Sequence, residues 1–255
     1  MTCVAARSET VGAFFDIDGT LLPAPSLEWR FTGYLLERNE ISSQQLGRWL
    51  AHFARTFWRN RHGAIEGNKR YLSGISEALV KDWEKSLSCG FLRADSLPFF
   101  EEALLRIAWH RAQGHRVFLV SGTLAPLARV AARALAADVA ADIGVCATEL
   151  EAAPRSPRAW SGRIVGEHMS GAAKLCALQM LAARYGIAVT RSYAYGDSAA
   201  DLQMLEGVGN AVAVNPTRAL ARVARKRRWQ TCLWEKTLGE TPNGPARQFA
   251  STAAR

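Results

Sequence analysis

Short apolar runs alternate with amphipathic segments along most of the chain. The runs are five to eight residues long and end in polar or small residues, as strands buried on both faces of a sheet do. The segments between them repeat apolar residues every three or four positions, which predicts helices. The runs occupy residues 11–15, 115–122, 142–148, 192–196 and 208–215. Alternation of this kind predicts a doubly wound α/β core, in which helices cover both faces of a parallel sheet. Residues 149–166 add a predicted β-hairpin with a proline-rich connection.

An all-helical stretch follows the first strand and its glycine- and proline-containing turn. We therefore expect an all-helical cap domain at residues 25–94, inserted into a core formed by residues 1–24 and 95–235. Residues 236–255 are polar and rich in Pro, Gly and Ala, which predicts a disordered tail.

Polar residues with catalytic potential stand where the predicted strands end. Asp16 and Asp18 follow the first strand, Ser121 ends the second, and Asp197 follows a later one, with Asp201 one helical turn further on. Ligands of doubly wound folds bind at the carboxyl ends of the strands, so we expect these side chains to meet.

Carboxylates placed this close repel one another unless a cation lies between them. Mg²⁺ prefers oxygen ligands, and Asp16, Asp18 and Asp197 are the candidate metal ligands, with Asp201 supporting them from behind. A bound Mg²⁺ neutralises charge on phosphoryl oxygens, so Mg²⁺ together with a phosphate is the ligand pair that this pattern favours.

Three further residues suit a phosphate ligand. The Ser121 hydroxyl can donate to a phosphoryl oxygen, and Gly122 allows a backbone N–H to approach closely. Lys174, early in a predicted helix, offers a positive charge. Each feature alone has an ordinary structural explanation as a turn, a cap or a solvated lysine; their occurrence together and in order favours a catalytic site.

Composition narrows the class of protein. The net charge of +9 favours anionic ligands in general. The densest basic cluster, at residues 222–228, closes a predicted helix and lacks the interleaved aromatic residues of single-strand binding, so we expect no nucleic-acid partner. The five cysteines have no ligand-like spacing, and no secretory leader or long apolar span is visible. These features predict a cytoplasmic protein without a disulfide framework.

The ordered motifs resemble those of the haloacid dehalogenase superfamily. DIDGTLL (16–22) resembles its first motif, LVSGT (119–123) its second, Lys174 its third and YGDSAAD (195–201) its fourth. The helical insert between the first two motifs resembles the cap of the phosphoserine-phosphatase-like branch, subfamily IB.

The resemblance implies a mechanism for the residues that match. Asp16 would attack phosphorus and form an aspartyl-phosphate, and Asp18 would protonate the leaving oxygen and later deprotonate water. Mg²⁺ would be held by Asp16, the backbone carbonyl of Asp18 and Asp197, while Ser121 and Lys174 would bind the transferring group. The implied activity is hydrolysis of a small phosphorylated metabolite.

The substrate stays open at this point. Gly19 replaces the serine of the DFDST motif found in phosphoserine phosphatases, and Glu28 is displaced from the position of their cap glutamate. Phosphoserine, histidinol phosphate and phospholipid-derived phosphates are alternative substrates, and a phosphotransferase or a non-catalytic phosphate-binding protein are alternative functions. The basic aromatic stretch at residues 48–62 could contact a large anionic substrate or a membrane surface; we favour an amphipathic helix packed within the cap. Arg30, Arg59, Lys69 and Arg70 are candidate substrate contacts.

Overall fold

The computed structural model of the chain describes residues 10–42, 44, 45, 47, 69–88, 97–139, 142–154, 156–235 and 237. The basic aromatic stretch at residues 48–62, and the tail beyond residue 237, lie outside the described residues.

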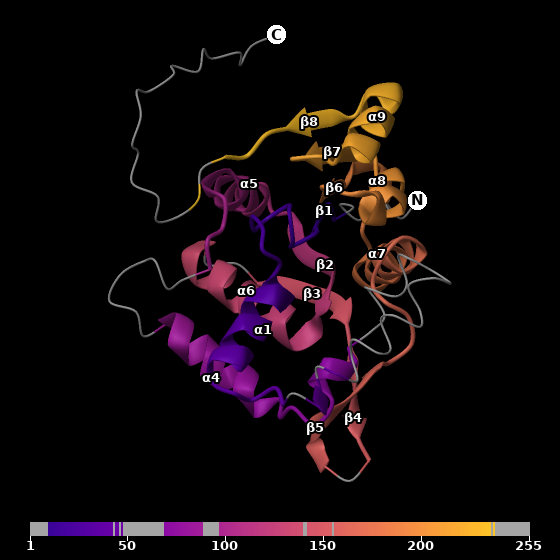
Figure 1. Cartoon of the computed structure of the whole chain (residues 1–255). Coiled ribbons are helices and arrows are strands. Elements are labelled where there is room, and N and C mark those ends of the chain that lie inside the picture. Colours follow the sequence, from indigo (N-terminus) through magenta and orange to yellow (C-terminus); the bar gives the residue numbers. More distant parts are fainter. Residues whose placement is uncertain are drawn as a thin grey trace, which may run out of the picture.

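A six-stranded parallel sheet forms the centre of the protein (Figure 1). Its strands follow the order β3-β2-β1-β6-β7-β8, so the first strand of the chain lies inside the sheet and the chain winds outward on both sides of it. The strands are β1 (Gly12–Phe15), β2 (Arg116–Leu124), β3 (Ile143–Thr148), β6 (Tyr193–Gly196), β7 (Asn210–Val214) and β8 (Gln230–Cys232). The predicted doubly wound core is confirmed.

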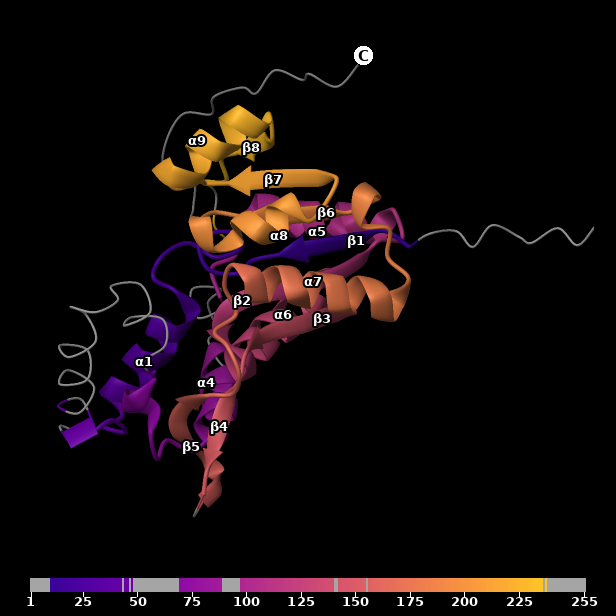
Figure 2. The ribbon, with the colours of Figure 1, turned by 90° about the vertical axis from the view of Figure 1, so that its right-hand side faces the viewer.

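Helices cover the two faces of the sheet, to the left and to the right of the strands in Figure 1, and Figure 2 looks onto one of these faces. On one face, Phe15 packs in a cluster with residues of α5 and α6, and on the other the adjacent Phe14 packs with α7, α8 and α9. Neighbouring side chains of a strand point to opposite faces, so burial of both phenylalanines requires both helical layers. These helices are α5 (Glu101–Ala112), α6 (Ala125–Val139), α7 (Ala172–Tyr185), α8 (Leu202–Glu206) and α9 (Arg218–Arg227).

Within the insert, three helices are described over their full length, and the predicted hairpin joins them. The helices are α1 (Leu27–Glu37), η1 (Arg70–Leu72) and α4 (Ala78–Ser88), and the antiparallel hairpin consists of β4 (Leu150–Ala153) and β5 (Ser156–Ile164). Backbone hydrogen bonds join the two parts: Gly74 N–H donates to the Trp160 carbonyl at 2.8 Å, and Trp160 N–H donates to the Ile75 carbonyl at 2.9 Å. The hairpin therefore extends the wall of the insert, although it lies in the core part of the sequence. The domain boundaries stay a prediction.

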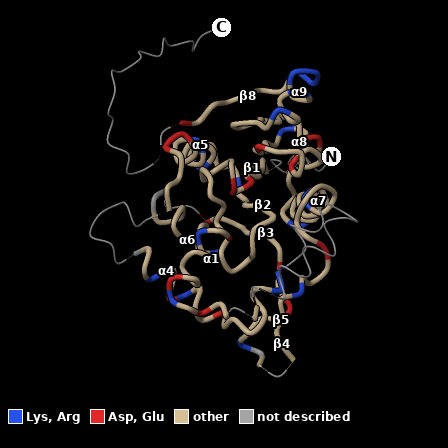
Figure 3. The backbone as a smooth tube through the Cα atoms, viewed as in Figure 1, with Lys and Arg blue, Asp and Glu red and all other residues tan. Residues whose placement is uncertain are grey.

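The basic cluster at the end of α9, blue in Figure 3, is exposed to solvent. Arg227 pairs with Glu206 of α8 across 2.7 Å. The helix that this cluster was predicted to close is present as α9, with basic residues in its last turn. None of the described helices is long and apolar enough to cross a membrane.

Candidate active site

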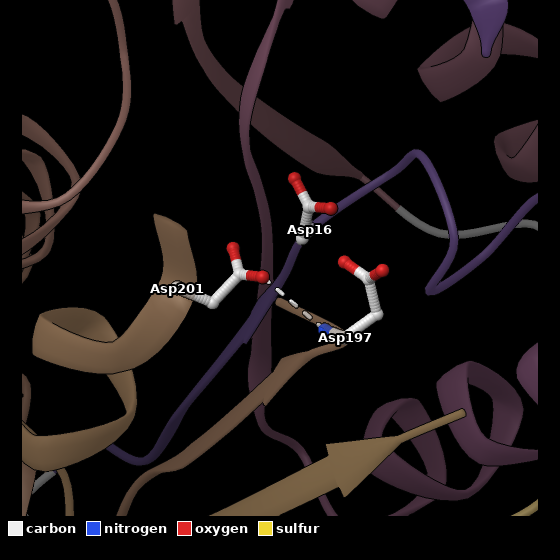
Figure 4. A group of neighbouring side chains, drawn as sticks. All are labelled: Asp16, Asp197 and Asp201. Atoms are coloured by element: carbon white, nitrogen blue, oxygen red, sulfur yellow. Dashed lines mark hydrogen bonds between the residues drawn. The ribbon is translucent and has the colours of Figure 1, made fainter. Parts of the chain in front are cut away.

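The ends of β1 and β6 bring three carboxylates together. Asp16 directly follows β1 and Asp197 directly follows β6, while Asp201 closes the short helical turn η4 (Ala199–Asp201). One carboxylate oxygen from each lies within 4.8 Å of the others. Figure 4 shows the three side chains around the ends of these strands. The Asp16 N–H donates to the Tyr195 carbonyl at 3.0 Å, which continues the pairing of β1 with β6 and fixes the spacing.

A buried lysine bridges two of these carboxylates. Lys174 lies in the first turn of α7 and is 2% exposed. Its Nζ donates to Oδ1 of Asp16 at 2.6 Å and to Oδ1 of Asp201 at 2.5 Å. Although burial favours the neutral amine, the charges of both aspartates raise the pKa of Lys174 above its ordinary value. The lysine therefore stays protonated and holds the Asp16 carboxylate in place.

Hydrogen bonds occupy both oxygens of Asp201. Oδ1 accepts from Lys174, and Oδ2 accepts from the backbone N–H groups of Asp197 (3.2 Å) and Ser198 (3.0 Å) and from the Ser198 hydroxyl (3.1 Å). The dashed line in Figure 4 marks the bond to Asp197. Asp201 thus ties the end of β6 to Lys174, as expected for a residue that supports the site from behind.

The site is acidic beyond what one lysine can compensate. Burial raises the pKa of Asp16 to about 8; Lys174 opposes the rise, and the charges of Asp201 and Asp18 add to it. Burial also raises the pKa of Asp197 to about 7, and Asp201 adds to that rise. Burial raises the pKa of Asp18 too, while the Leu27 N–H, which donates to its Oδ1 at 2.7 Å, opposes the change.

Four carboxylates around one ammonium group fit a divalent cation. Asp16 and Asp197 offer carboxylate oxygens, which hard cations such as Mg²⁺ prefer. Asp201 is the third member of this cluster, yet its oxygens already accept four hydrogen bonds. The donor set therefore suits a metal between Asp16 and Asp197.

The turn after β1 packs so closely against Asp197 that position 19 requires glycine. Gly19 has φ +84°, a conformation that favours glycine, and a Cβ there would lie 2.5 Å from Oδ2 of Asp197. The turn after β1 thus passes directly against the Asp197 carboxylate, which explains the glycine of the DIDGT sequence.

The end of β2 supplies the second side of the site. Ser121 is 1% exposed, and its Oγ accepts a hydrogen bond from the Thr123 N–H at 3.3 Å. Thr148 donates to the Gly122 carbonyl at 2.8 Å, and a Cβ on Gly122 would lie 2.8 Å from Cε1 of His168. The imidazole of His168 therefore packs directly over this glycine.

A cavity of about 400 Å³ joins the carboxylates to the insert. Asp16, Asp18, Ser121, Lys174 and Asp197 line one end of it, and Gly122 lies beside them. The structure thus gathers every residue predicted for catalysis, phosphate binding or metal binding at one place, with Asp201 directly behind. The individual roles of these residues stay predictions.

The opposite end of the cavity contains residues that lie outside the four sequence motifs. Lys69 donates to Oε1 and Oε2 of Glu28 at 2.8 and 2.6 Å, and the Tyr71 hydroxyl donates to the same carboxylate. In the sequence, Glu28 stands out only as displaced from the position of a cap glutamate, and Lys69 only as one of several candidate substrate contacts. Tyr71 and His168 carry no recognisable signal. Arg30, another plausible substrate contact, instead donates to the carbonyls of Pro25 and Pro23 at 2.9 and 3.1 Å.

Sequence comparison relates the chain to known hydrolases and phosphatases. A family model described as haloacid dehalogenase-like hydrolase matches residues 13–206. The phosphoserine phosphatase SerB1 of Mycobacterium tuberculosis is 30% identical over 233 residues, which cover 87% of this chain and 70% of that protein. A probable phosphatase of the same organism is 28% identical, and the match covers 98% of this chain and 85% of that protein.

The fold is also found among solved structures. A protein of unknown function from Bordetella pertussis Tohama I superposes with a TM-score of 0.69 at 24% identity, over 88% of this chain and 99% of that one. The family model spans the chain from β1, which precedes Asp16, to α8, which follows Asp201. The family expected from the four motifs is confirmed: the chain belongs to the haloacid dehalogenase-like hydrolases, as an enzyme of their phosphatase branch.

Proposed function

We propose that this enzyme is a Mg²⁺-dependent phosphomonoesterase that acts through an aspartyl-phosphate on Asp16. The observation that supports this most directly is the buried ion pair of Lys174 with Asp16, beside Ser121 and at the end of a cavity. A carboxylate held by one oxygen on a lysine keeps its other oxygen for attack. The same lysine supplies positive charge where phosphoryl oxygens would lie.

In the first step, Oδ2 of Asp16 forms a bond to phosphorus, and the bond from phosphorus to the leaving oxygen breaks. Asp18 donates its proton to that oxygen, so an alcohol leaves. Burial raises the pKa of Asp18, which favours the protonated form that this step needs. Ser121 and the N–H groups of its turn, together with Lys174, hold the transferring group.

In the second step, water attacks the same phosphorus while Asp18, now ionised, accepts its proton. The bond between phosphorus and Asp16 breaks and frees the carboxylate and inorganic phosphate. The Leu27 N–H, which donates to Oδ1 of Asp18, leaves the second oxygen of Asp18 for both proton transfers. One residue thus serves as acid and then as base.

Asp16, Asp197 and the backbone carbonyl of Asp18 would hold the Mg²⁺, with Asp201 positioning the end of β6 behind them. When bound, the ion neutralises charge on the carboxylates and on the phosphoryl oxygens. The substrate is a small phosphorylated metabolite, and the naming of a relative as phosphoserine phosphatase makes phosphoserine one candidate. We expect the enzyme to act in the cytoplasm and without a nucleic-acid partner.

The decisive experiment compares wild type with Asp16→Asn in an assay of phosphate release from p-nitrophenyl phosphate. We expect Asp16→Asn to lose turnover while its circular dichroism stays unchanged. Asp142→Asn is the matched control, because Asp142 is exposed just before β3, at the other end of the sheet. Turnover by Asp16→Asn at the wild-type rate would refute the mechanism.

Two further measurements separate the steps. Acid-quenched wild-type enzyme should carry phosphate on the peptide that contains Asp16, and phosphate on another peptide would exclude Asp16 as nucleophile. Removal of divalent ions with a chelator should stop turnover and added Mg²⁺ should restore it. Adding acceptor alcohols tests the phosphotransferase alternative, since a transferase would form new phosphate esters in place of free phosphate.

A further inference from the structure

The insert presents a paired acid and base to the cavity. The Glu28 carboxylate, in the first turn of α1, accepts from Lys69 with both oxygens and from the Tyr71 hydroxyl with Oε1. The Lys69 and Glu28 side chains are 7% and 16% exposed. We call these three residues the cap triad.

The cap triad lies beside the predicted acid. Glu28 follows Leu27, whose N–H donates to Asp18 at 2.7 Å, and both Glu28 and Asp18 line the cavity. A leaving group attached to phosphorus at Asp16 therefore extends from Asp18 towards this triad. The triad is in a position to select the leaving group.

The triad offers no uncompensated charge. Of the described residues that line the cavity, Glu28 and Lys69 are the only Asp, Glu, Lys or Arg side chains outside the phosphate end, and they neutralise each other. An ammonium group on the substrate would need Glu28 without its partner, and a carboxylate would need Lys69 without its partner. Separating a largely buried ion pair costs much free energy, and this cost disfavours both arrangements.

The position of Lys69 is fixed by the hairpin. A Cβ on Gly162 of β5 would lie 3.1 Å from the Lys69 carbonyl oxygen and 3.0 Å from Cα of Arg70, so the strand passes directly against this segment. The backbone bonds of Gly74 and Ile75 to Trp160 hold the following residues. The ion pair is therefore part of a rigid wall, with little freedom to rearrange around a charged ligand.

Three apolar side chains of the insert also line the cavity, together with the polar Ser26 and Thr32. Trp29, Leu36 and Ile41 line it, and Trp29 and Leu36 are 62% and 48% exposed. Large apolar side chains exposed at a cavity favour contact with an apolar ligand surface.

We propose that the leaving group of the substrate is an uncharged alcohol with apolar surface, rather than a zwitterionic amino acid such as serine. This inference rests on the proposed phosphatase function and assigns its specificity to the neutral cap triad and to Trp29, Leu36 and Ile41. The paired Glu28 and Lys69 side chains present polar atoms but no net charge to the bound alcohol.

The test uses esters that differ in charge and little in shape. Propyl phosphate and phosphoethanolamine have leaving groups of nearly equal size, neutral and cationic; phosphoglycolate is the anionic counterpart and phosphoserine the zwitterion. We expect kcat/KM for propyl phosphate to exceed that for each charged ester by at least about tenfold. For hexyl phosphate, kcat/KM should exceed that for propyl phosphate by about tenfold. Phosphoserine or phosphoethanolamine hydrolysed as well as propyl phosphate would overturn the inference. Absence of phosphate release from every ester would refute the proposed function itself.

Two variants change the charge of the triad in opposite directions. Lys69→Met leaves the Glu28 carboxylate uncompensated, so the ratio of kcat/KM for phosphoethanolamine over propyl phosphate should rise by about tenfold or more. Glu28→Gln leaves Lys69 charged and retains an oxygen for Tyr71. In this variant, the ratio of kcat/KM for phosphoglycolate over propyl phosphate should rise instead. The control is Glu206→Gln, which removes a surface ion pair with Arg227 that does not line the cavity, and it should leave all ratios unchanged. Unchanged ratios in whichever cap variants fold would overturn the inference.

Discussion

Adding one methyl group at position 19 should weaken metal binding and leave the nucleophile Asp16 unchanged. In Gly19→Ala the new Cβ would lie 2.5 Å from Oδ2 of Asp197, whereas an ordinary contact begins at 3.4 Å. The carboxylate must therefore retreat by roughly 0.9 Å. Displacements of this size at a reacting centre reduce the reaction rate about 100-fold. Changes beside metal ligands reduce metal affinity about 10- to 100-fold. We expect the Mg²⁺ concentration for half-maximal activity to rise by at least about tenfold.

The measurement is a Mg²⁺ titration of phosphate release, with thermal unfolding followed in parallel. The positive φ of +84° adds about 1–2 kcal/mol of backbone strain, which must be separated from the collision with Asp197. Gly114→Ala provides this control: Gly114 has φ +72° and no heavy atom within 4 Å of the added Cβ. Both variants should lose similar stability, and only Gly19→Ala should need more Mg²⁺. Identical Mg²⁺ curves for wild type and Gly19→Ala would show that Asp197 does not bind the metal.

Three further outcomes follow from buried groups and close contacts. Lys174→Met leaves two buried carboxylates without their cation, so urea unfolding should show a loss of about 3–5 kcal/mol; a loss below 1 kcal/mol would contradict this. Burial lowers the pKa of His110 to about 3 from 6.5, so the unfolded chain binds the additional proton below pH 6.5. Stability should therefore fall by about 2 kcal/mol between pH 6.5 and pH 5, and His110→Gln should show a smaller fall in the same unfolding assay. Gly162→Ala, with φ +78° and its Cβ 3.1 Å from the Lys69 carbonyl, should raise KM for propyl phosphate more than it lowers kcat, and a change in kcat alone would argue against a role of the hairpin in the cavity wall.

The catalytic end of the site could be predicted because its residues follow the strands. Asp16 and Asp197 come directly after apolar runs, and parallel strands bring their carboxyl ends to one edge, so sequence order alone places them together. Lys174 was identified by its place in the motif order rather than by any local pattern. Its contact with Asp16 spans 158 positions and depends on how α7 packs on the sheet.

The substrate end could not be predicted in the same way. Glu28 and Lys69 are 41 positions apart, and their pairing depends on the fold of the insert and on the hairpin that packs against it. No periodicity encodes a contact between an insert and a later hairpin. Strand β8 was also missed, because three residues of mostly exposed character give no apolar signal.

The pairing of the hairpin with the insert has a consequence for motion. The N–H of Glu77 donates to the carbonyl of Arg158 at 2.9 Å, in addition to the two bonds of Trp160, so residues 74–77 and β5 share a short backbone ladder. Opening of the cavity therefore carries the hairpin together with Lys69 and its neighbours as one body. Such an opening must bend the two stems that join the hairpin to the core, near Glu149 and Gly166, as well as the connections of the insert to the core. Gly166, at φ +70° with open space around it, provides the backbone freedom that such a hinge needs.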